Sequence, residues 1–200
     1  MSLLTICEKL AENVGLEVSD QIISSTKREW AEAVTMSNSV GAELARRVDF
    51  GILHRSTALV GNGSDQTYDI GAEFSRIIPG IGVTYNGSTV RPLTQAEWAS
   101  LVPVLGVPRY FLLEGRNLQL WPFLGSGLNA SVRWQSKYWC SNGSAEWVAD
   151  TDTSLIDEDL MVKGLIVRWR RQKGMEYGDY EAEYEATLAD IAGFDDRSRL

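Results

Sequence analysis

The stretch of residues 150–191 restricts the fold more than any other part of the sequence. Acidic residues at 157–159 precede a long helical pattern that ends in a basic run, a charge order that matches the dipole of one helix. Gly174 is expected to end this helix, and Gly193 is expected to end a second one. Between the two glycines, aromatic and aliphatic residues recur every three or four positions, which predicts an apolar helix face. These residues are Tyr177, Tyr180, Tyr184, Leu188 and Ile191.

Residues 1–51 predict a second pair of helices at the other end of the chain. Gly15 is expected to end the first helix, and residues 26–29 have the pattern of a capping box that starts the second. Gly41 inside the second helix costs about 1 kcal/mol relative to alanine, so it predicts a close packing contact. The apolar stripes are Leu3, Ile6, Cys7, Leu10 and Val14 in the first helix, and Trp30, Ala33, Val34, Val40, Leu44 and Val48 in the second.

The middle of the chain changes to patterns that are typical of strands and tight turns. Asn-Gly pairs tolerate the positive φ that hairpin turns require. Three such pairs occur, at 62–63, 86–87 and 142–143. Residues 114–117 predict another turn, and residues 94–97 predict one short capped helix. Residues 131–139 alternate so that one face of a strand is expected to be buried. Residues 52–147 therefore predict an antiparallel β domain, either a sandwich or a barrel.

Composition excludes several classes of protein. The chain has 200 residues and a net charge of −8, whereas nucleic-acid binders concentrate Lys and Arg. No apolar run approaches the roughly 18 residues that a membrane span needs. The N-terminus lacks a basic leader followed by an apolar run, so no secretion signal is expected. We therefore expect a protein that is made in the cytoplasm, with no membrane partner and no large nucleic-acid surface.

The sequence predicts no catalytic, cofactor or metal site. His54 is the only histidine, and no partner at a recognisable spacing accompanies it. Cys7 and Cys140 are isolated thiols without metal-ligand spacing. Residues 150–154 begin like a calcium loop, but the glycine and the glutamate that such a loop requires are missing. We expect these polar residues to cap the following helix instead, and we expect no enzyme activity.

Several of the tryptophans leave an alternative open. Trp30 and Trp134 lie on apolar faces and are expected in the core. Trp121, Trp139 and Trp147 lie near strand ends, where an exposed indole could stack on a sugar or dock a partner protein. Burial in the core or at a subunit interface is favoured. A carbohydrate-binding or lytic module that uses exposed tryptophans is kept as the alternative.

A basic cluster ends the first C-terminal helix. Its members are Arg168, Arg170, Arg171 and Lys173. Positive charge at this end complements the helix dipole, an explanation that needs no ligand. Phosphate binding is a second reading of the cluster. An ion-pair surface against an acidic partner is a third, and it remains open.

Eight sequence blocks carry a resemblance that runs nearly end to end. They are LL at 3–4, AENVGL at 11–16, ELARRVDF at 43–50, EFSR at 73–76, RPL at 91–93, NLQLWP at 117–122, DTDTSLIDE at 150–158 and GLIVRWR at 164–170. In the order and spacing of these blocks the chain resembles the head–tail adaptor proteins, or connectors, of tailed phages. It also has the broader layout of the tail tubular A proteins of short-tailed phages. One departure is Gly71-Ala72, where relatives often carry a proline, and it affects the local turn.

The resemblance implies a ring, typically of twelve copies, that docks beneath the portal protein at the capsid vertex. It implies that helices build the ring and that the β insertion faces outward or toward tail or nozzle proteins. DNA would pass through the lumen without sequence-specific binding, and the protein would be part of the virion. It also implies that the C-terminal segment becomes ordered at the portal. The ordering cost delays binding until the right surface is present.

We therefore predict an α+β fold in which the N- and C-terminal helices form a bundle, with an inserted antiparallel β domain that resembles a sandwich or a barrel. The predicted domains are residues 1–51 with 148–193, residues 52–147, and a flexible tail at 194–200. The predicted function is a head–tail adaptor that joins the portal to the tail and helps to retain or pass DNA. The expected portal contacts are the basic cluster and the tail residues Phe194, Arg197, Arg199 and Leu200.

Overall fold

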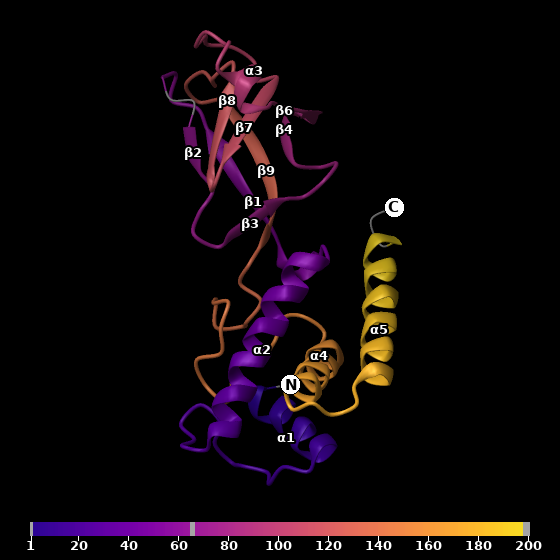
Figure 1. Cartoon of the computed structure of the whole chain (residues 1–200). Coiled ribbons are helices and arrows are strands. Elements are labelled where there is room, and N and C mark those ends of the chain that lie inside the picture. Colours follow the sequence, from indigo (N-terminus) through magenta and orange to yellow (C-terminus); the bar gives the residue numbers. More distant parts are fainter. Residues whose placement is uncertain (1, 65–66, 198–200) are drawn as a thin grey trace. The chain divides into compact units, whose positions relative to one another are not determined.

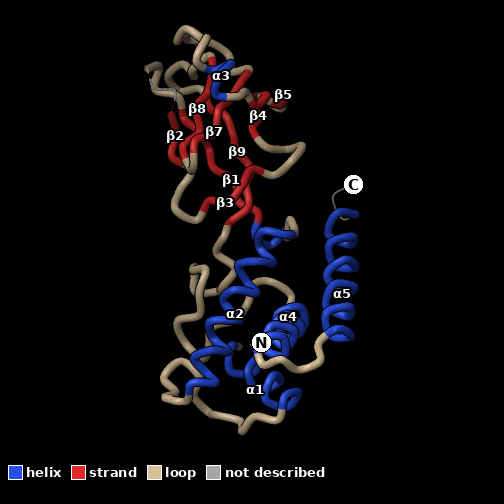
Figure 2. The backbone as a smooth tube through the Cα atoms, in the orientation of Figure 1, coloured by secondary structure: helices blue, strands red, loops and turns tan. Residues whose placement is uncertain are grey.

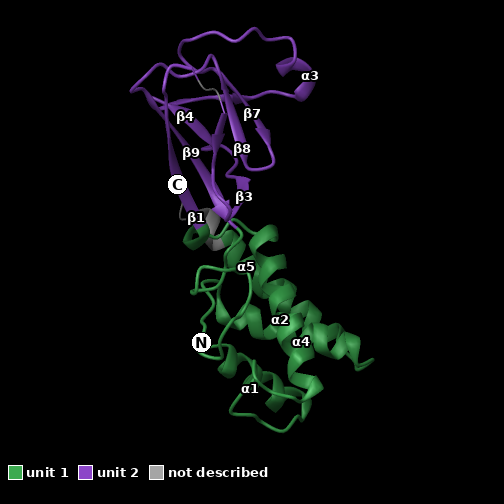
Figure 3. Ribbon diagram, turned by 90° about the vertical axis from the view of Figure 1, so that its left-hand side faces the viewer, with its two compact units in different colours: residues 1–53, 137–200 green, residues 54–136 purple. Residues whose placement is uncertain are grey.

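The computed structural model of this chain describes residues 2–64 and 67–197, with the side chains of the last helix described through Gly193. The described residues form five α-helices and two β-sheets, so the fold is α+β (Figure 1, Figure 2). The chain separates into two compact units (Figure 3). The helical unit is Met1–Leu53 with Lys137–Leu200, and the β unit is His54–Ser136.

In the helical unit, one helix lies between the others. The bounds are α1 Leu3–Val14, α2 Arg28–Arg47, α4 Glu158–Gln172 and α5 Gly178–Arg197, with a 3-10 turn at Gly51–Leu53. α4 packs against α1, α2 and α5 (Figure 1). It buries Leu160, Met161, Val162, Gly164, Leu165, Ile166, Val167 and Trp169. These residues occupy more than one face of the helix, as expected of a helix with neighbours on several sides.

Local signals set several helix ends as predicted. Gly15 ends α1 with a φ of 73°, and Gly174 follows α4 with a φ of 68°. Asp157 caps the start of α4, where its carboxylate accepts the backbone N–H of Leu160 at 3.1 Å. The two predicted glycine ends are confirmed. The prediction that residues 150–154 cap α4 is wrong, because Asp157 is the cap and the carboxylates of Asp150 and Asp152 accept N–H groups of other segments.

Two predicted helix boundaries are wrong. α2 begins at Arg28 without a side-chain cap. The hydroxyl of Ser25 accepts the N–H of Lys27 at 3.3 Å, and this local turn replaces the predicted capping box. α5 continues past Gly193 to Arg197, because a glycine weakens a helix without ending it when its backbone stays helical. Residues 194–197 of the predicted tail are therefore helical, and residues 198–200 lie outside the described residues.

The segment at 137–147 belongs to the helical unit, although the sequence pattern assigned it to the β domain. Trp139 and Trp147 pack edge to face with ring centroids 4.7 Å apart, and both are buried. The indole N–H of Trp147 donates to the hydroxyl of Ser37 of α2 at 2.8 Å. Burial of two large aromatic rings against the helices outweighs the strand-like alternation of this segment.

Gly41 of α2 makes the close contact that its position predicts. A Cβ atom at this residue would lie 2.3, 2.5 and 2.6 Å from three ring carbons of Trp139. No carbon atom tolerates such distances, so only glycine lets the indole lie flat against the helix.

Replacing Gly41 with alanine is therefore expected to destabilise the helical unit by about 1–3 kcal/mol, despite the better helix propensity of alanine. The matched control is Gly193→Ala, because a Cβ at Gly193 meets no atom within 4 Å. That substitution is expected to raise the free energy of unfolding by up to about 1 kcal/mol. Urea denaturation followed by circular dichroism measures both. Equal stabilisation by the two alanines would contradict the packing explanation.

The β unit contains two sheets and one short helix. The first sheet has the order β1-β9-β4-β5, with β3 also paired to β9, and the second has the order β2-β8-β7-β6. The bounds are β1 His54–Val60, β2 Thr67–Asp69, β3 Phe74–Ile77, β4 Val83–Tyr85, β5 Ser88–Thr89, β6 Arg91–Pro92, α3 Gln95–Trp98, β7 Tyr110–Glu114, β8 Asn117–Trp121 and β9 Asn129–Ser136. The β6–β7 pair is parallel, so the prediction of purely antiparallel sheets is corrected.

Both sheets contribute to one core, and β9 supplies its longest strand. Val132 and Trp134 of β9 are buried with Leu59 of β1 and Leu118 and Leu120 of β8. The predicted burial of Trp134 is confirmed, as is that of Trp30 in the helical unit. β9 ends at Ser136, three residues before the predicted end of the strand, because Trp139 is buried in the helical core.

Turn chemistry in the β unit agrees with the sequence. Asn86 and Gly87 have φ values of 47° and 77° and join β4 to β5 across the pair Tyr85–Ser88. Two successive positive φ values are those of a type I′ hairpin turn. Gly115, with a φ of 61°, turns β7 back into β8. Thr94 and Glu97 form the predicted capping box of α3.

Candidate functional site

The basic cluster at the end of α4 is engaged inside the helical unit. The guanidinium of Arg168 pairs with Glu43 of α2. Lys173 pairs with Glu32 of α2 at 2.5 Å, and its ammonium lies 4.8 Å from the centre of the Trp169 ring. These two cations therefore join α4 to α2.

The other two members of the cluster face α5. Arg171 pairs with Glu181, and its guanidinium lies 4.8 Å from the centre of the Tyr177 ring. Arg170 lies 4.0 Å from the ring centre of Tyr180 and donates to its hydroxyl at 3.0 Å. The tyrosine stripe that predicted an apolar helix face thus also provides cation–π partners.

Further pairs attach the middle of α5. Arg47 of α2 pairs with Glu185 at 2.6 Å, and Lys163 of α4 pairs with Glu183 at 3.0 Å. The buried apolar contacts of α5 come from Tyr184 and Leu188. Exposed ion pairs are individually weak, so α5 is held by many small contributions together with two buried side chains.

The predicted portal contacts therefore fall into two groups. The four cations at the end of α4 all have partners within the chain. Arg168 and Lys173 join α4 to α2. Arg170 and Arg171 contact α5. Phe194 and Arg197 lie on the last turns of α5, beyond Ile191, which still packs against the helical core. Arg199 and Leu200 lie outside the described residues.

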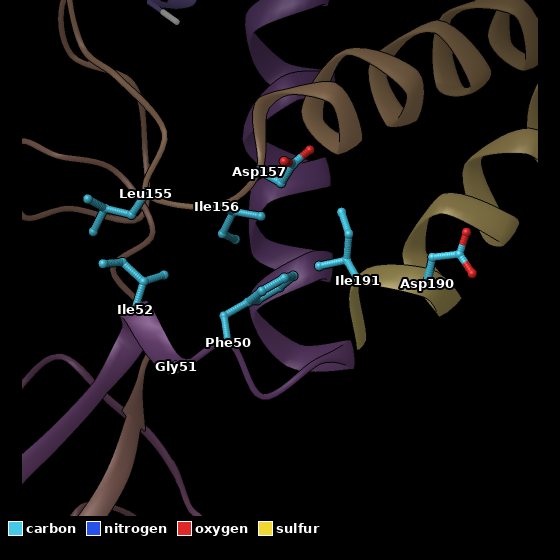
Figure 4. Close-up of a pocket in the computed structure, with 8 residues that line it drawn as sticks. All are labelled: Phe50, Gly51, Ile52, Leu155, Ile156, Asp157, Asp190 and Ile191. Carbon is cyan, nitrogen blue, oxygen red and sulfur yellow. The ribbon is translucent and has the colours of Figure 1, made fainter. Parts of the chain in front are cut away.

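An apolar groove lies beside the second half of α5, and no sequence pattern pointed to it. Its volume is about 460 Å³. The apolar side chains gather around a common space, whereas the carboxylates of Asp157 and Asp190 stand at the edge and turn away from it (Figure 4). The apolar residues come from three separate stretches and are Phe50, Ile52, Leu155, Ile156 and Ile191.

The loop before α4 is organised by two carboxylates that accept backbone N–H groups. Asp152 accepts from Val148 at 2.7 Å and from Ala149 at 2.8 Å. Asp150 accepts from Ile23 at 2.8 Å, which fixes the connection between α1 and α2. Within residues 2–64 and 67–197, no group of three acidic, His or Cys residues is placed to hold a metal ion. The carboxylates in the segment that resembles the start of a calcium loop accept hydrogen bonds from backbone N–H groups instead.

Asp152 makes the stability of this loop depend on pH. Burial raises the pKa of its carboxyl, but the N–H groups of Val148 and Ala149 and the amide of Asn142 outweigh burial and hold the pKa below its ordinary value. Because the folded-state pKa is the lower one, this stabilisation is present above the ordinary pKa and is lost as the pH falls through the folded-state pKa.

The substitution Asp152→Asn is therefore expected to lower the free energy of unfolding by about 1 kcal/mol near neutral pH. The difference from the unaltered chain should shrink in strong acid, where the carboxyl is protonated in both states. Urea denaturation at the two pH values measures this. Asp20→Asn, on an exposed loop, is the matched control. A difference that does not change with pH would contradict the assigned role of the carboxylate.

The tryptophans of the alternative reading are largely unavailable to a sugar. Trp139 and Trp147 are 0% and 5% exposed, so neither can stack on a ligand. Trp121 is half-buried, and its indole N–H donates to the carbonyl of Val102 at 2.8 Å. Of the three tryptophans near strand ends, only Trp121 keeps an accessible surface.

Comparison with known protein families gives a match along the whole chain. The family model described as SU10 adaptor protein matches residues 1–200, the whole chain. No curated protein matches the sequence. Among the described residues, no helix has both the length and the apolar character that crossing a membrane requires. The chain therefore belongs to the SU10 adaptor family, a family of tailed-phage adaptor proteins.

Proposed function

We propose that copies of this adaptor assemble into a ring of twelve that joins the portal to the tail. The family match over the whole chain supports a structural role in the virion of a tailed phage and contacts with portal, tail and sibling subunits. The helices from both chain ends act as a bundle that builds the ring. The β unit, acting as a sandwich, faces outward or toward tail and nozzle proteins.

The single structural observation that carries this proposal is the end of α5. The helix continues to Arg197, whereas Ile191 is the last of its described side chains that packs against the helical core. We propose that the residues beyond Ile191 contact a partner protein. We assign this end of the chain to the portal, and we assign the basic cluster a supporting role because two of its members, Arg170 and Arg171, contact α5.

The net charge of the chain supports the proposed passage of DNA. The net charge of −8 disfavours tight binding of the phosphate backbone, since phosphate contacts require Lys and Arg. An acidic lumen lets DNA slide and be retained by closure of the complex rather than by adhesion. Within this proposal the protein has no catalytic task.

The mass of the assembly tests the proposal. Light scattering of the purified chain, alone and mixed with purified portal protein, gives the number of copies, and electron microscopy of the mixture shows a ring or its absence. We expect a complex of twelve copies on the portal. A chain that stays free of the portal at every concentration, or a mature virion that lacks it, would overturn the proposed function.

A further inference from the structure

Both units of this chain have apolar side chains that are exposed to solvent. The β unit has an apolar loop, residues 102–107, between α3 and β7. Its sequence VPVLGV carries no charge. Exposure is high along the loop: Val102 76%, Val104 46%, Leu105 54% and Val107 55%. Contiguous apolar exposure of this kind marks interaction sites in soluble proteins.

The apolar loop is held in shape by its backbone. Gly106 donates to the carbonyl of Phe123 at 3.1 Å, and Phe123 donates to the carbonyl of Val104 at 3.0 Å. The indole of Trp121 donates to the carbonyl of Val102 at 2.8 Å. Because these bonds fix the backbone beside the end of β8, the valine and leucine side chains form a preorganised surface, and binding costs little conformational entropy.

The second surface is the apolar groove of the helical unit. It is concave and has a volume of about 460 Å³ (Figure 4). Ile52, one of its lining residues, is 58% exposed to solvent. Small branched side chains such as valine suit a groove that is lined by isoleucine, leucine and phenylalanine.

Charges beside the two surfaces are opposite. Arg109 follows the apolar loop by two residues and is exposed, and it forms no ion pair among the described residues. Asp190 at the edge of the groove is likewise exposed and lacks an ion-pair partner among them. Asp157 adds a second negative charge at that edge. Complementary charge of this kind fixes the register of a contact.

We propose that the apolar loop of one copy binds in the apolar groove of the neighbouring copy, with Arg109 placed against Asp190. This inference rests on the proposed ring. A closed ring requires a heterologous contact, in which each copy offers two different surfaces that fit each other. A neutral convex loop flanked by a cation and an apolar groove flanked by carboxylates meet that requirement.

A charge-reversal experiment tests the contact. Rings are formed from the full chain with portal protein, and their assembly is measured by light scattering. Arg109→Asp and Asp190→Arg are each expected to weaken assembly at least tenfold, and the double variant is expected to restore it. Val104→Glu should also weaken assembly. Val148→Glu is the matched control, because Val148 is 67% exposed and lies outside both surfaces.

Covalent capture identifies the occupant of the groove. The variant Val104→Cys/Ile52→Cys is expected to give a ladder of disulfide-linked multimers, while Cys7 and Cys140 are buried. Disulfides confined to single chains would overturn the proposal. Normal rings from all the loop and charge variants would also overturn it. Variants that form normal rings and lose only the binding of tail protein would overturn it as well. In both cases the proposed adaptor role stands. If the unaltered chain forms no ring, the proposed function is overturned, and the proposed contact between copies is overturned with it.

Discussion

Deletion of residues 194–200 is expected to leave the helical unit folded and to abolish the joining of heads to tails. The fold should survive because the deletion leaves in place every described residue of α5 that packs against the core, the last of which is Ile191. The change in the free energy of unfolding is expected to stay within about 0.5 kcal/mol. Function should be lost because the deleted residues are those assigned to the portal contact.

Two measurements separate these effects. Circular dichroism during urea denaturation checks the fold, and electron microscopy of lysates counts heads with and without tails. A Gly-Ser segment of the same length in place of 194–200 should fail equally, which shows that side chains matter and not chain length. Val18→Ser, an exposed loop change, should give normal particles. Infectious particles in normal number from the deletion would refute the assignment.

Replacement of Trp139 by alanine is expected to lower the free energy of unfolding of the helical unit by about 3–5 kcal/mol. The indole is 0% exposed, contacts the ring of Trp147, and fills the space that Gly41 leaves beside α2. Removal of the indole leaves a cavity beside α2 and the ring of Trp147. Because these neighbours relax only partly into the cavity, much of the lost packing energy is not recovered.

The matched control is Trp121→Ala in the β unit. Trp121 is half-buried, so a smaller loss is expected, and it should affect the β unit alone. Helical circular dichroism during denaturation distinguishes the two variants. A change below about 1 kcal/mol for Trp139→Ala would show that the ring is not a core element. Glycan binding by the unaltered chain that disappears with Trp121→Ala would instead support the carbohydrate alternative.

Features that depend on a few neighbouring residues could be predicted from the sequence. The positive φ of Gly15, Gly174 and the Asn86-Gly87 pair is a local requirement, so the ends of α1 and α4 and one hairpin follow directly. The end of α5 could not be predicted, since Gly193 is compatible with both a helix and a stop. Only the surrounding structure decides between them.

Features that depend on distant residues were beyond sequence reasoning. The pairing of Arg168 with Glu43 joins residues 125 positions apart, and nothing local distinguishes it from a cation kept free for a partner. Trp139 continues the alternation of a strand, yet it is buried with the helices. The groove draws a few residues from each of three separate stretches, and such a site has no periodicity to detect.

The discontinuous helical unit has a consequence for synthesis. The β unit is a single run of chain, complete once residue 136 has been made, whereas the helical unit needs both ends. Until α4 emerges from the ribosome, the apolar faces of α1 and α2 lack the helix that they share as a partner, because α4 packs against both. A prematurely terminated polypeptide therefore exposes the apolar faces of α1 and α2 and becomes a substrate for chaperones and proteases. Translation itself thus sorts whole subunits from fragments before any of them reaches a capsid.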